Sequence, residues 1–343
     1  MIHRTSRRAV ALAAALSASL LLGACAGDVD EPDPSPEATE AQEPVALTVG
    51  LTYTPDIQFA PWYVAEAQGY FTDEGLDVEL RHHGASESLF GALEAGEEDV
   101  VVAGGDEMLQ AHSQGVPIIN IATVYHGYPV ALIVPEDSPI TDASDLEGHT
   151  VGIPGPFGET WFGLLALLAD AGLSEDDVSI EHIGFTQQAA LTAGHVDAIM
   201  GFSNNDAVQF ELADLPVRTI ALTSEGEPPL VGIGLGAHEA IIGEHPEALR
   251  GLVAATERAI ADIAADPAAA VEMSAGHVPG LESPDARATA QATLEATVPL
   301  YDGEAEADRS AQWQQMADFM AAHDLLGEHL DATGAVTDEF RQP

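Results

Sequence analysis

Residues 45–80, VALTVGLTYTPDIQFAPWYVAEAQGYFTDEGLDVEL, contain a strand pattern, a helix pattern and a second strand pattern in succession. From Val45 to Thr52, apolar residues alternate with small ones, which is typical of a strand. Pro61 opens a helical pattern that Gly69 ends, and Leu76 to Leu80 has the composition of the next strand. This order predicts the start of an α/β body.

The same alternation continues beyond residue 80 and predicts an α/β body with a mostly parallel sheet. Further strands are expected at 100–103, 118–122, 130–134, 150–153, 178–183 and 196–201, and helices at 86–94, 160–171 and 187–193. Ala221 and Leu222, and then an apolar stretch at 230–235, lead back out of this series. From Pro246 onward the pattern is purely helical. Its apolar stripes are Leu249, Leu252, Val253, Ile260 and Ile263, and then Trp313, Met316, Phe319 and Met320. We interpret the second stripe as packing rather than a ligand surface.

The charge balance limits the possible partners. The 343 residues include 57 acidic and 10 basic ones, all ten of the latter arginine. Such a field repels phosphate backbones and anionic head groups, which excludes a nucleic-acid binder or a polybasic membrane-surface protein. A single cysteine excludes an internal disulfide, a Cys-rich zinc site and an iron–sulfur cluster. We hypothesise that the acidity reflects a saline habitat.

The first 24 residues have the pattern of an export signal. Three arginines precede an apolar run from Ala9 to Leu22, which is shorter than the roughly 20 residues that a membrane-spanning helix needs. The run ends in LGAC at 22–25, which resembles the bacterial lipobox. That resemblance implies cleavage before Cys25, lipidation of its thiol and an extracytoplasmic anchor in the cell membrane. An ordinary signal peptide with a stray cysteine is the alternative. The adjacent Arg7 and Arg8 are compatible with twin-arginine export, so the export route stays open.

Residues 26–44, AGDVDEPDPSPEATEAQEP, contain four prolines, seven acids and no aromatic residue. Such a stretch cannot bury enough apolar surface to offset the entropy of ordering it. We therefore predict a disordered tether over 25–44, with a two-domain body after it.

Several motifs in the body resemble those of a known family. They are APWYVA at 60–65, GYF at 69–71, EGLDV at 74–78, DLEGHTVG at 145–152, GHVDA at 194–198 and HPE at 245–247. They are similar to signatures of periplasmic-type (type II) substrate-binding proteins of ABC importers. The group is the one that includes the binders of thiamine pyrimidine precursors and the fungal pyrimidine synthases. The likeness covers about 45–326.

The resemblance implies a two-lobed fold with two hinge crossings and a ligand cleft that closes by hinge motion. Lobe one would combine 45–133 with 231–343, and lobe two would be 134–230. The physics of open α/β sheets agrees, because ligands bind where strands end and helix starts converge.

In lobe one, three loops after strands supply candidate cleft residues. Tyr53 and Phe59 could stack on a flat ring and Asp56 could accept from an amine, or Asp56 could cap a helix beside core aromatics. Two glycine-containing turns carry the next candidates, with helix capping as the alternative for Ser86 and Asp106. The lobe-one set, including an aromatic wall near the first crossing, is Tyr53, Asp56, Phe59, Ser86, Glu87, Asp106, Glu107, Tyr125 and Tyr128.

In lobe two, two loops face that set. The stretch 155–161 offers free amides and two aromatic rings, and 201–206 offers amide and carboxylate groups for the edges of a heterocycle. The second loop is also acceptable as a solvent-exposed loop. The lobe-two candidates are Phe157, Glu159, Thr160, Trp161, Asn204, Asn205 and Asp206.

The ligand that the resemblance implies is a thiamine pyrimidine precursor of the hydroxymethylpyrimidine or formylaminopyrimidine type. In those binders the last loop tends to carry aromatics and a glutamate, whereas this chain has Asn204-Asn205-Asp206. The departure leaves room for a larger heterocycle such as riboflavin. Only Arg81 and Arg218 in these segments could neutralise a phosphate, although helix amides alone might hold an alkanesulfonate.

A receptor is favoured over an enzyme or a metalloprotein. The fungal relatives consume an active-site histidine, whose place Glu107 or a neighbour takes here, and need a cysteine-rich iron motif that this chain lacks. Adjacent His82 and His83 on a strand point to opposite faces, so no metal site is expected. We expect a monomeric, lipid-anchored receptor without a cofactor that feeds an ABC permease and ATPase. A sensor or adhesion lipoprotein on the same scaffold is the third alternative.

Overall fold

The structure is a computed structural model that describes residues 43–84, 87–302, 309–327 and 332–340. The predicted signal peptide, Cys25, nearly all of the predicted tether and Ser86 lie outside these ranges. None of the helices within them has the length and apolarity needed to cross a membrane.

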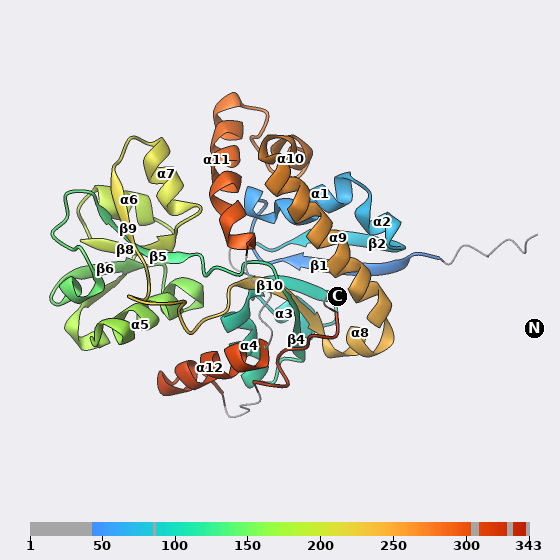
Figure 1. The fold of residues 1–343 in the computed structure, drawn as a ribbon, viewed down its shortest axis with the longest axis horizontal. Helices are drawn as coiled ribbons and strands as arrows, with labels where there is room; N and C mark the ends of the chain where they lie inside the picture. The colour runs from blue at the N-terminus through green and yellow to red at the C-terminus, as the bar shows by residue number, and fades with distance from the viewer. Residues whose placement is uncertain (1–42, 85–86, 303–308, 328–331, 341–343) are drawn as a thin grey trace, which may run out of the picture. The chain divides into compact units, whose positions relative to one another are not determined.

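Two five-stranded sheets organise the described residues, as expected for a two-lobed α/β fold (Figure 1). The first sheet has the order β2-β1-β3-β10-β4 and the second the order β7-β6-β8-β5-β9. The strands of the first sheet are β1 (Val45–Leu51), β2 (Leu76–His82), β3 (Val100–Gly104), β4 (Ile118–Thr123) and β10 (Ile233–His238). Those of the second are β5 (Val130–Pro135), β6 (Thr150–Ile153), β7 (Ser179–His182), β8 (Ala198–Phe202) and β9 (Val217–Ile220).

The prediction of mostly parallel strands is confirmed for strand direction, because four of the five strands in each sheet run the same way, but both sheets are mixed since β10 and β5 run against their neighbours. β1 pairs in parallel with β2, from Val45 opposite Leu76 to Leu51 opposite His82, and also with β3. β10 runs antiparallel to β3 and β4, and β5 runs antiparallel to β8 and β9. β5 and β10 each follow a crossing from the other sheet, so no helical crossover aligns them with their neighbours.

Helices surround the two sheets. The helices that accompany the first sheet are η1 (Ile57–Phe59), α1 (Ala60–Ala67), α2 (Tyr70–Asp73), α3 (Gly91–Glu94), α4 (Gly105–Ser113), α8 (Glu239–Glu244), α9 (Pro246–Ala265), α10 (Pro267–Ser274), α11 (Pro284–Tyr301) and α12 (Arg309–Ala322). With the second belong η2 (Ala143–Leu146), α5 (Gly158–Ala171), η3 (Glu175–Asp177), α6 (Gln187–Thr192) and α7 (Asp206–Leu212), which lie at the left of Figure 1. The helices expected at 160–171 and from Pro246 are confirmed, whereas α3 begins only at Gly91.

The apolar stripes lie in the core, as predicted. α9 buries Leu249, Leu252, Val253 and Ile263. α12 buries Trp313, Met316 and Met320, which confirms the interpretation of that stripe as packing. A single buried cluster includes Met108 beside the first sheet and Phe162 beside the second, so the lobes share a packed interface.

The chain passes between the sheets at 124–129 and again at 221–232, so the second sheet is built from one continuous segment. β5 already belongs to the second sheet at Val130. The helix α11 bridges the lobes, because Asn204 donates from Nδ2 to Oγ1 of Thr297 at 2.9 Å. The lobe limits expected from the sequence stay a prediction.

Candidate functional site

A cavity of about 470 Å³ lies between the two lobes. Its walls come from the segments that follow β1, β2 and β3 in the first lobe and β6, β7 and β8 in the second. The carboxyl ends of both sheets therefore meet at this cavity, which is where α/β folds bind ligands.

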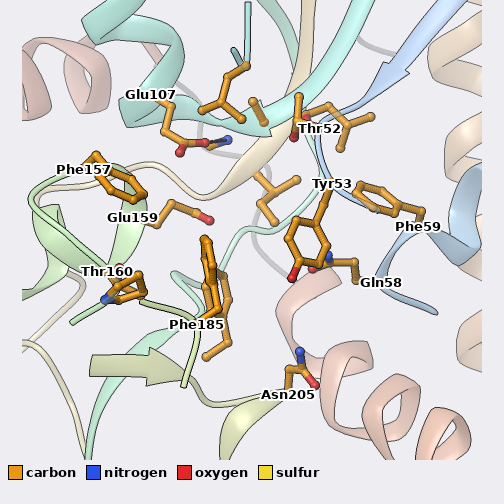
Figure 2. A pocket seen from close by; sticks show the side chains of 18 of the residues that line it. Thr52, Tyr53, Gln58, Phe59, Glu107, Phe157, Glu159, Thr160, Phe185 and Asn205 are labelled. Atoms are coloured by element: carbon orange, nitrogen blue, oxygen red, sulfur yellow. Dashed lines mark hydrogen bonds between the residues drawn. The ribbon is translucent and has the colours of Figure 1, made fainter. Parts of the chain in front are cut away.

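Most of the residues predicted for the cleft line this cavity (Figure 2). They are Tyr53, Phe59, Glu87, Glu107, Tyr125, Phe157, Glu159, Thr160, Asn205 and Asp206. That each of them contacts a ligand stays a prediction.

The other predicted residues lie behind the wall or beside it. Asp56 caps η1, because its Oδ1 accepts from the backbone N–H of Gln58 at 3.0 Å. Asn204 is buried and donates to α11 as described above. Trp161 is half-buried and packs against the apolar core. The capping alternative accounts for Asp56, whereas burial of Asn204 does not fit the solvent-exposed loop that was the alternative for 201–206.

The buried carboxyl group of Asp106 and the half-buried Tyr128 form a hydrogen-bonded pair next to the cavity. The Tyr128 hydroxyl donates to Oδ2 of Asp106 at 2.6 Å, and its oxygen lies 3.1 Å from the backbone carbonyl oxygen of Glu159. Oδ1 of Asp106 accepts from the backbone N–H of Glu107 at 2.7 Å. Both oxygens of Asp106 thus have protein partners, and the carboxyl supports the cavity from behind.

Aromatic rings from both lobes face the cavity. Tyr53 of the first lobe and Phe185 of the second have ring centroids 6.3 Å apart at an interplanar angle of 54°. Their exposed fractions are 38% and 63%, and that of Phe157 is 55%, so these rings still present apolar surface to an incoming molecule. Figure 2 shows Phe185 below Glu159, with Tyr53 to the right of both. An arrangement of this kind suits a flat ring.

Sequence reasoning missed several lining residues, including Thr52, Gln58, Trp62, Phe185, Gln187 and Phe202. Phe185 had a usable signal, because it follows a strand and precedes a helix like the loops that were selected. Trp62 was assigned to a helix, and its 1% exposure is typical of a core residue although it borders the cavity.

Three carboxyl groups converge at the inner end of the cavity. Asp106 and Glu107 begin α4 in the first lobe, and Glu159 begins α5 in the second. Burial, with the nearby carboxylate of Glu107, raises the pKa of Asp106 to about 8. Burial likewise raises the pKa of Glu107 to about 7. Burial and the charges of Asp106 and Glu107 raise the pKa of Glu159 well above its ordinary value. Close to neutral pH the cluster therefore retains protons.

Cationic side chains do not balance these carboxyl groups. Among the described residues that line the cavity there is no arginine or histidine, and the chain has no lysine. Arg81 forms ion pairs with Glu87 and Glu98. Arg218 donates to the backbone carbonyls of residues 136, 138 and 140. Both arginines considered for anion binding are thus engaged elsewhere.

Comparison with known proteins agrees with this geometry. The model of the NMT1/THI5 like family matches residues 56–270. The riboflavin-binding protein RibY of Chloroflexus aurantiacus is 32% identical over 335 residues, which cover 94% of each chain. The formylaminopyrimidine-binding protein of Halalkalibacterium halodurans is 23% identical over 331 residues, covering 94% of this chain and 97% of that protein.

Solved structures share the fold. The periplasmic aliphatic sulphonate binding protein SsuA of Escherichia coli superposes with a TM-score of 0.69 at 19% identity, covering 86% of this chain and 92% of its own. The alkanesulfonate-binding protein SsuA of Xanthomonas axonopodis, bound to MOPS, gives 0.67 at 20% identity and covers 86% and 99%. The two-lobed periplasmic binding fold expected from the motifs is thereby confirmed.

Proposed function

This chain belongs to the NMT1/THI5-like family, and on that premise we propose that it captures riboflavin or a closely related flavin for an ABC importer. The observation that carries the proposal is a cavity between two lobes with aromatic rings on both sides and no cationic side chain among its described lining residues. Such a site holds a flat, uncharged molecule by stacking and by hydrogen bonds.

The size of the cavity favours a flavin over a single pyrimidine ring. Its volume of about 470 Å³ is within the roughly 300–1,000 Å³ of pockets that enclose drug-sized ligands. A tricyclic ring with a sugar-alcohol chain fills such a space, whereas a pyrimidine would leave much of it to water. The relative named as a riboflavin-binding protein supports the same choice.

A thiamine pyrimidine precursor is the second candidate. The relative named as a formylaminopyrimidine-binding protein favours it, and the carboxylate and amide groups of Glu107, Asn205 and Asp206 could pair with an aminopyrimidine edge. An alkanesulfonate is disfavoured, because the described lining holds no cationic side chain that would compensate the charge of a buried sulfonate.

We further propose that capture, rather than catalysis, is the activity of this chain. Residues 1–24 have the pattern of an export signal, and Cys25 would carry the lipid that anchors a monomeric protein outside the cytoplasm. A permease and an ATPase would be its partners, and hinge closure would trap the ligand without a cofactor.

A binding screen with the purified protein tests this proposal. Riboflavin, formylaminopyrimidine, hydroxymethylpyrimidine and an alkanesulfonate are compared by calorimetry and by thermal shift. We expect riboflavin to bind most tightly, with quenching of its fluorescence and a rise in unfolding temperature. Tighter binding of a pyrimidine would favour the second candidate. Appearance of a chemical product from either ligand would contradict a receptor role.

A further inference from the structure

We propose that Glu107 and Glu159 form a specificity-determining subsite that accepts the hydroxylated side chain of a flavin and rejects a phosphate on that chain. The inference rests on the proposed flavin function and deepens it. It distinguishes riboflavin from riboflavin 5′-phosphate as the ligand.

The two carboxylates meet across the boundary between the lobes. Glu107 of α4 accepts at Oε2 from the backbone N–H of Gly104 at 3.1 Å. Its other oxygen, Oε1, would lie only 3.2 Å from a Cβ built on Gly158 of the second lobe. In the same way, a Cβ on Gly104 would lie 3.2 Å from the carboxyl carbon of Glu159. Each carboxylate thus occupies space left open by a glycine of the opposite lobe.

Glu159 has an unmet need for a hydrogen-bond donor. Its exposed fraction is 8%, it lines the cavity, and its Oε1 has no hydrogen-bond partner in the described part of the protein. Asp106 cannot offer a further lone pair so readily, because Tyr128 and the amide of Glu107 already donate to it. An unsatisfied buried acceptor is costly, and a ligand hydroxyl would satisfy it.

The position of the rings determines which part of the ligand reaches the carboxylates. Tyr53 and Phe185 are partly exposed, whereas Glu159 is buried. Figure 2 shows Glu107 and Glu159 on the same side of the cavity, across from Tyr53 and Phe59. Tyr53 and Phe185 already contact each other, so a flat ring would lie against their exposed faces and extend its polar chain toward the two glutamates.

The same groups disfavour an anion. A phosphate would enter next to Glu107 and Glu159, with Asp106 directly behind them. Burial raises the pKa of Glu107 only to about 7, so this carboxyl group is ionised above about pH 8, and its charge then repels a phosphate strongly because the interior weakens screening. No arginine or histidine in the described lining would offset that repulsion. Exclusion by an unpaired like charge is a common route to specificity.

Dissociation constants for three flavins test the inference. They are riboflavin, riboflavin 5′-phosphate, and lumiflavin, which has a methyl group in place of the hydroxylated chain. In the unmodified protein we expect riboflavin to bind at least about 100-fold more tightly than its phosphate. At about pH 8.5, where Glu107 is ionised, we expect that ratio to fall at least about tenfold in Glu107→Gln, with lumiflavin affinity within about twofold.

The matched control is Glu211→Gln, which removes one negative charge from an exposed position on α7 outside the cavity lining. It should leave the ratio unchanged. Equal affinity of the unmodified protein for riboflavin and its phosphate would overturn the inference without any variant. So would an unchanged ratio in a folded Glu107→Gln variant, or a loss of lumiflavin affinity as large as that of riboflavin. Failure of every flavin to bind would instead contradict the proposed function.

Discussion

Phe185 shows how a single exposed ring contributes to recognition. Its 63% exposure leaves its face available, and Tyr53 of the other lobe is its ring partner. We predict that Phe185→Ala weakens riboflavin binding about fivefold, since an aromatic contact contributes about 1 kcal/mol. Calorimetric titration measures this change. Leu212→Ala is the control, because Leu212 is 48% exposed and lies outside the cavity lining. Equal effects of the two variants would contradict the prediction.

Individual residues were predictable where position along a strand determined them. Tyr53, Glu107 and Glu159 lie in segments that follow strands, and all three line the cavity. Asp56 has the same kind of position, but it caps a helix instead, since a carboxylate serves a ligand or a backbone amide equally well. A single sequence contains nothing that distinguishes these two partners.

The helix starts of α4 and α5 make the stability of the protein dependent on pH. The groups that face one another are Asp106, Glu107 and Glu159, with Tyr125 and Tyr128 from the first crossing. Burial raises the pKa of Asp106 to about 8 and that of Glu107 to about 7. The folded state therefore holds more protons than the unfolded state, whose carboxyl pKa values are about 4. Hence the free energy of unfolding falls as pH rises through this window.

We predict that Glu159→Gln reduces this pH dependence. Removal of one titrating group lowers the slope by up to about 1.4 kcal/mol per pH unit between about pH 5 and about pH 7. Denaturant unfolding of the ligand-free protein at several pH values measures the slope. Glu211→Gln controls for the loss of net charge, because Glu211 is exposed. If both variants gave the same slope, the carboxyl cluster would not be the source.

The turn from β3 to α4 has little room for a side chain. A Cβ at Gly104 would lie 2.5 Å from Oδ1 of Asp106 and 3.1 Å from Cγ of Glu159 in the other lobe. We predict that Gly104→Ala lowers the free energy of unfolding by about 1–3 kcal/mol and weakens ligand binding, because the added methyl separates the lobes. Gly243→Ala in α8 has open space around it and should be neutral or slightly stabilising. Thermal unfolding with and without riboflavin compares the two.

Elements were predicted better than the way they pair. The strands that were expected agree with the structure to within a few residues, because hydrophobic periodicity reports local burial, but β9 was missed. Strand direction depends on the connection between neighbours, and the direct crossings into β5 and β10 replaced the helical connections that would impose parallel pairing. The hydrophobic pattern within a strand does not reveal whether the preceding strand belongs to the same sheet or to the other one.

The charge of the whole molecule predicts a response to salt. The formal net charge is −47, so the folded state contains strong self-repulsion. Raising sodium chloride from about 0.1 M to about 1 M shortens the screening length from about 10 Å to about 3 Å. We predict that the unfolding temperature rises over this range. A flat or falling temperature would contradict both the prediction and the saline-habitat hypothesis.

At the scale of the molecule, the two-lobed fold could be predicted because several separate motifs resemble one family in the same order. The identity of the ligand could not be predicted from the motifs. It depends on which rings and carboxylates the two lobes bring together across the cleft, and residues such as Glu107 and Glu159 lie 52 positions apart in the chain. That proximity arises only when the sheets face each other.

The second sheet is formed by one uninterrupted segment, from β5 to β9, so the coding sequence of the second lobe is continuous. The chain leaves the first lobe once, before residue 130, and returns to it once, after residue 220. One exchange of coding sequence could therefore transfer the whole cavity wall of the second lobe into a relative. Half of the recognition surface would then be inherited as a unit. New specificities could arise in this family by recombination at two junctions, without gradual remodelling of every loop.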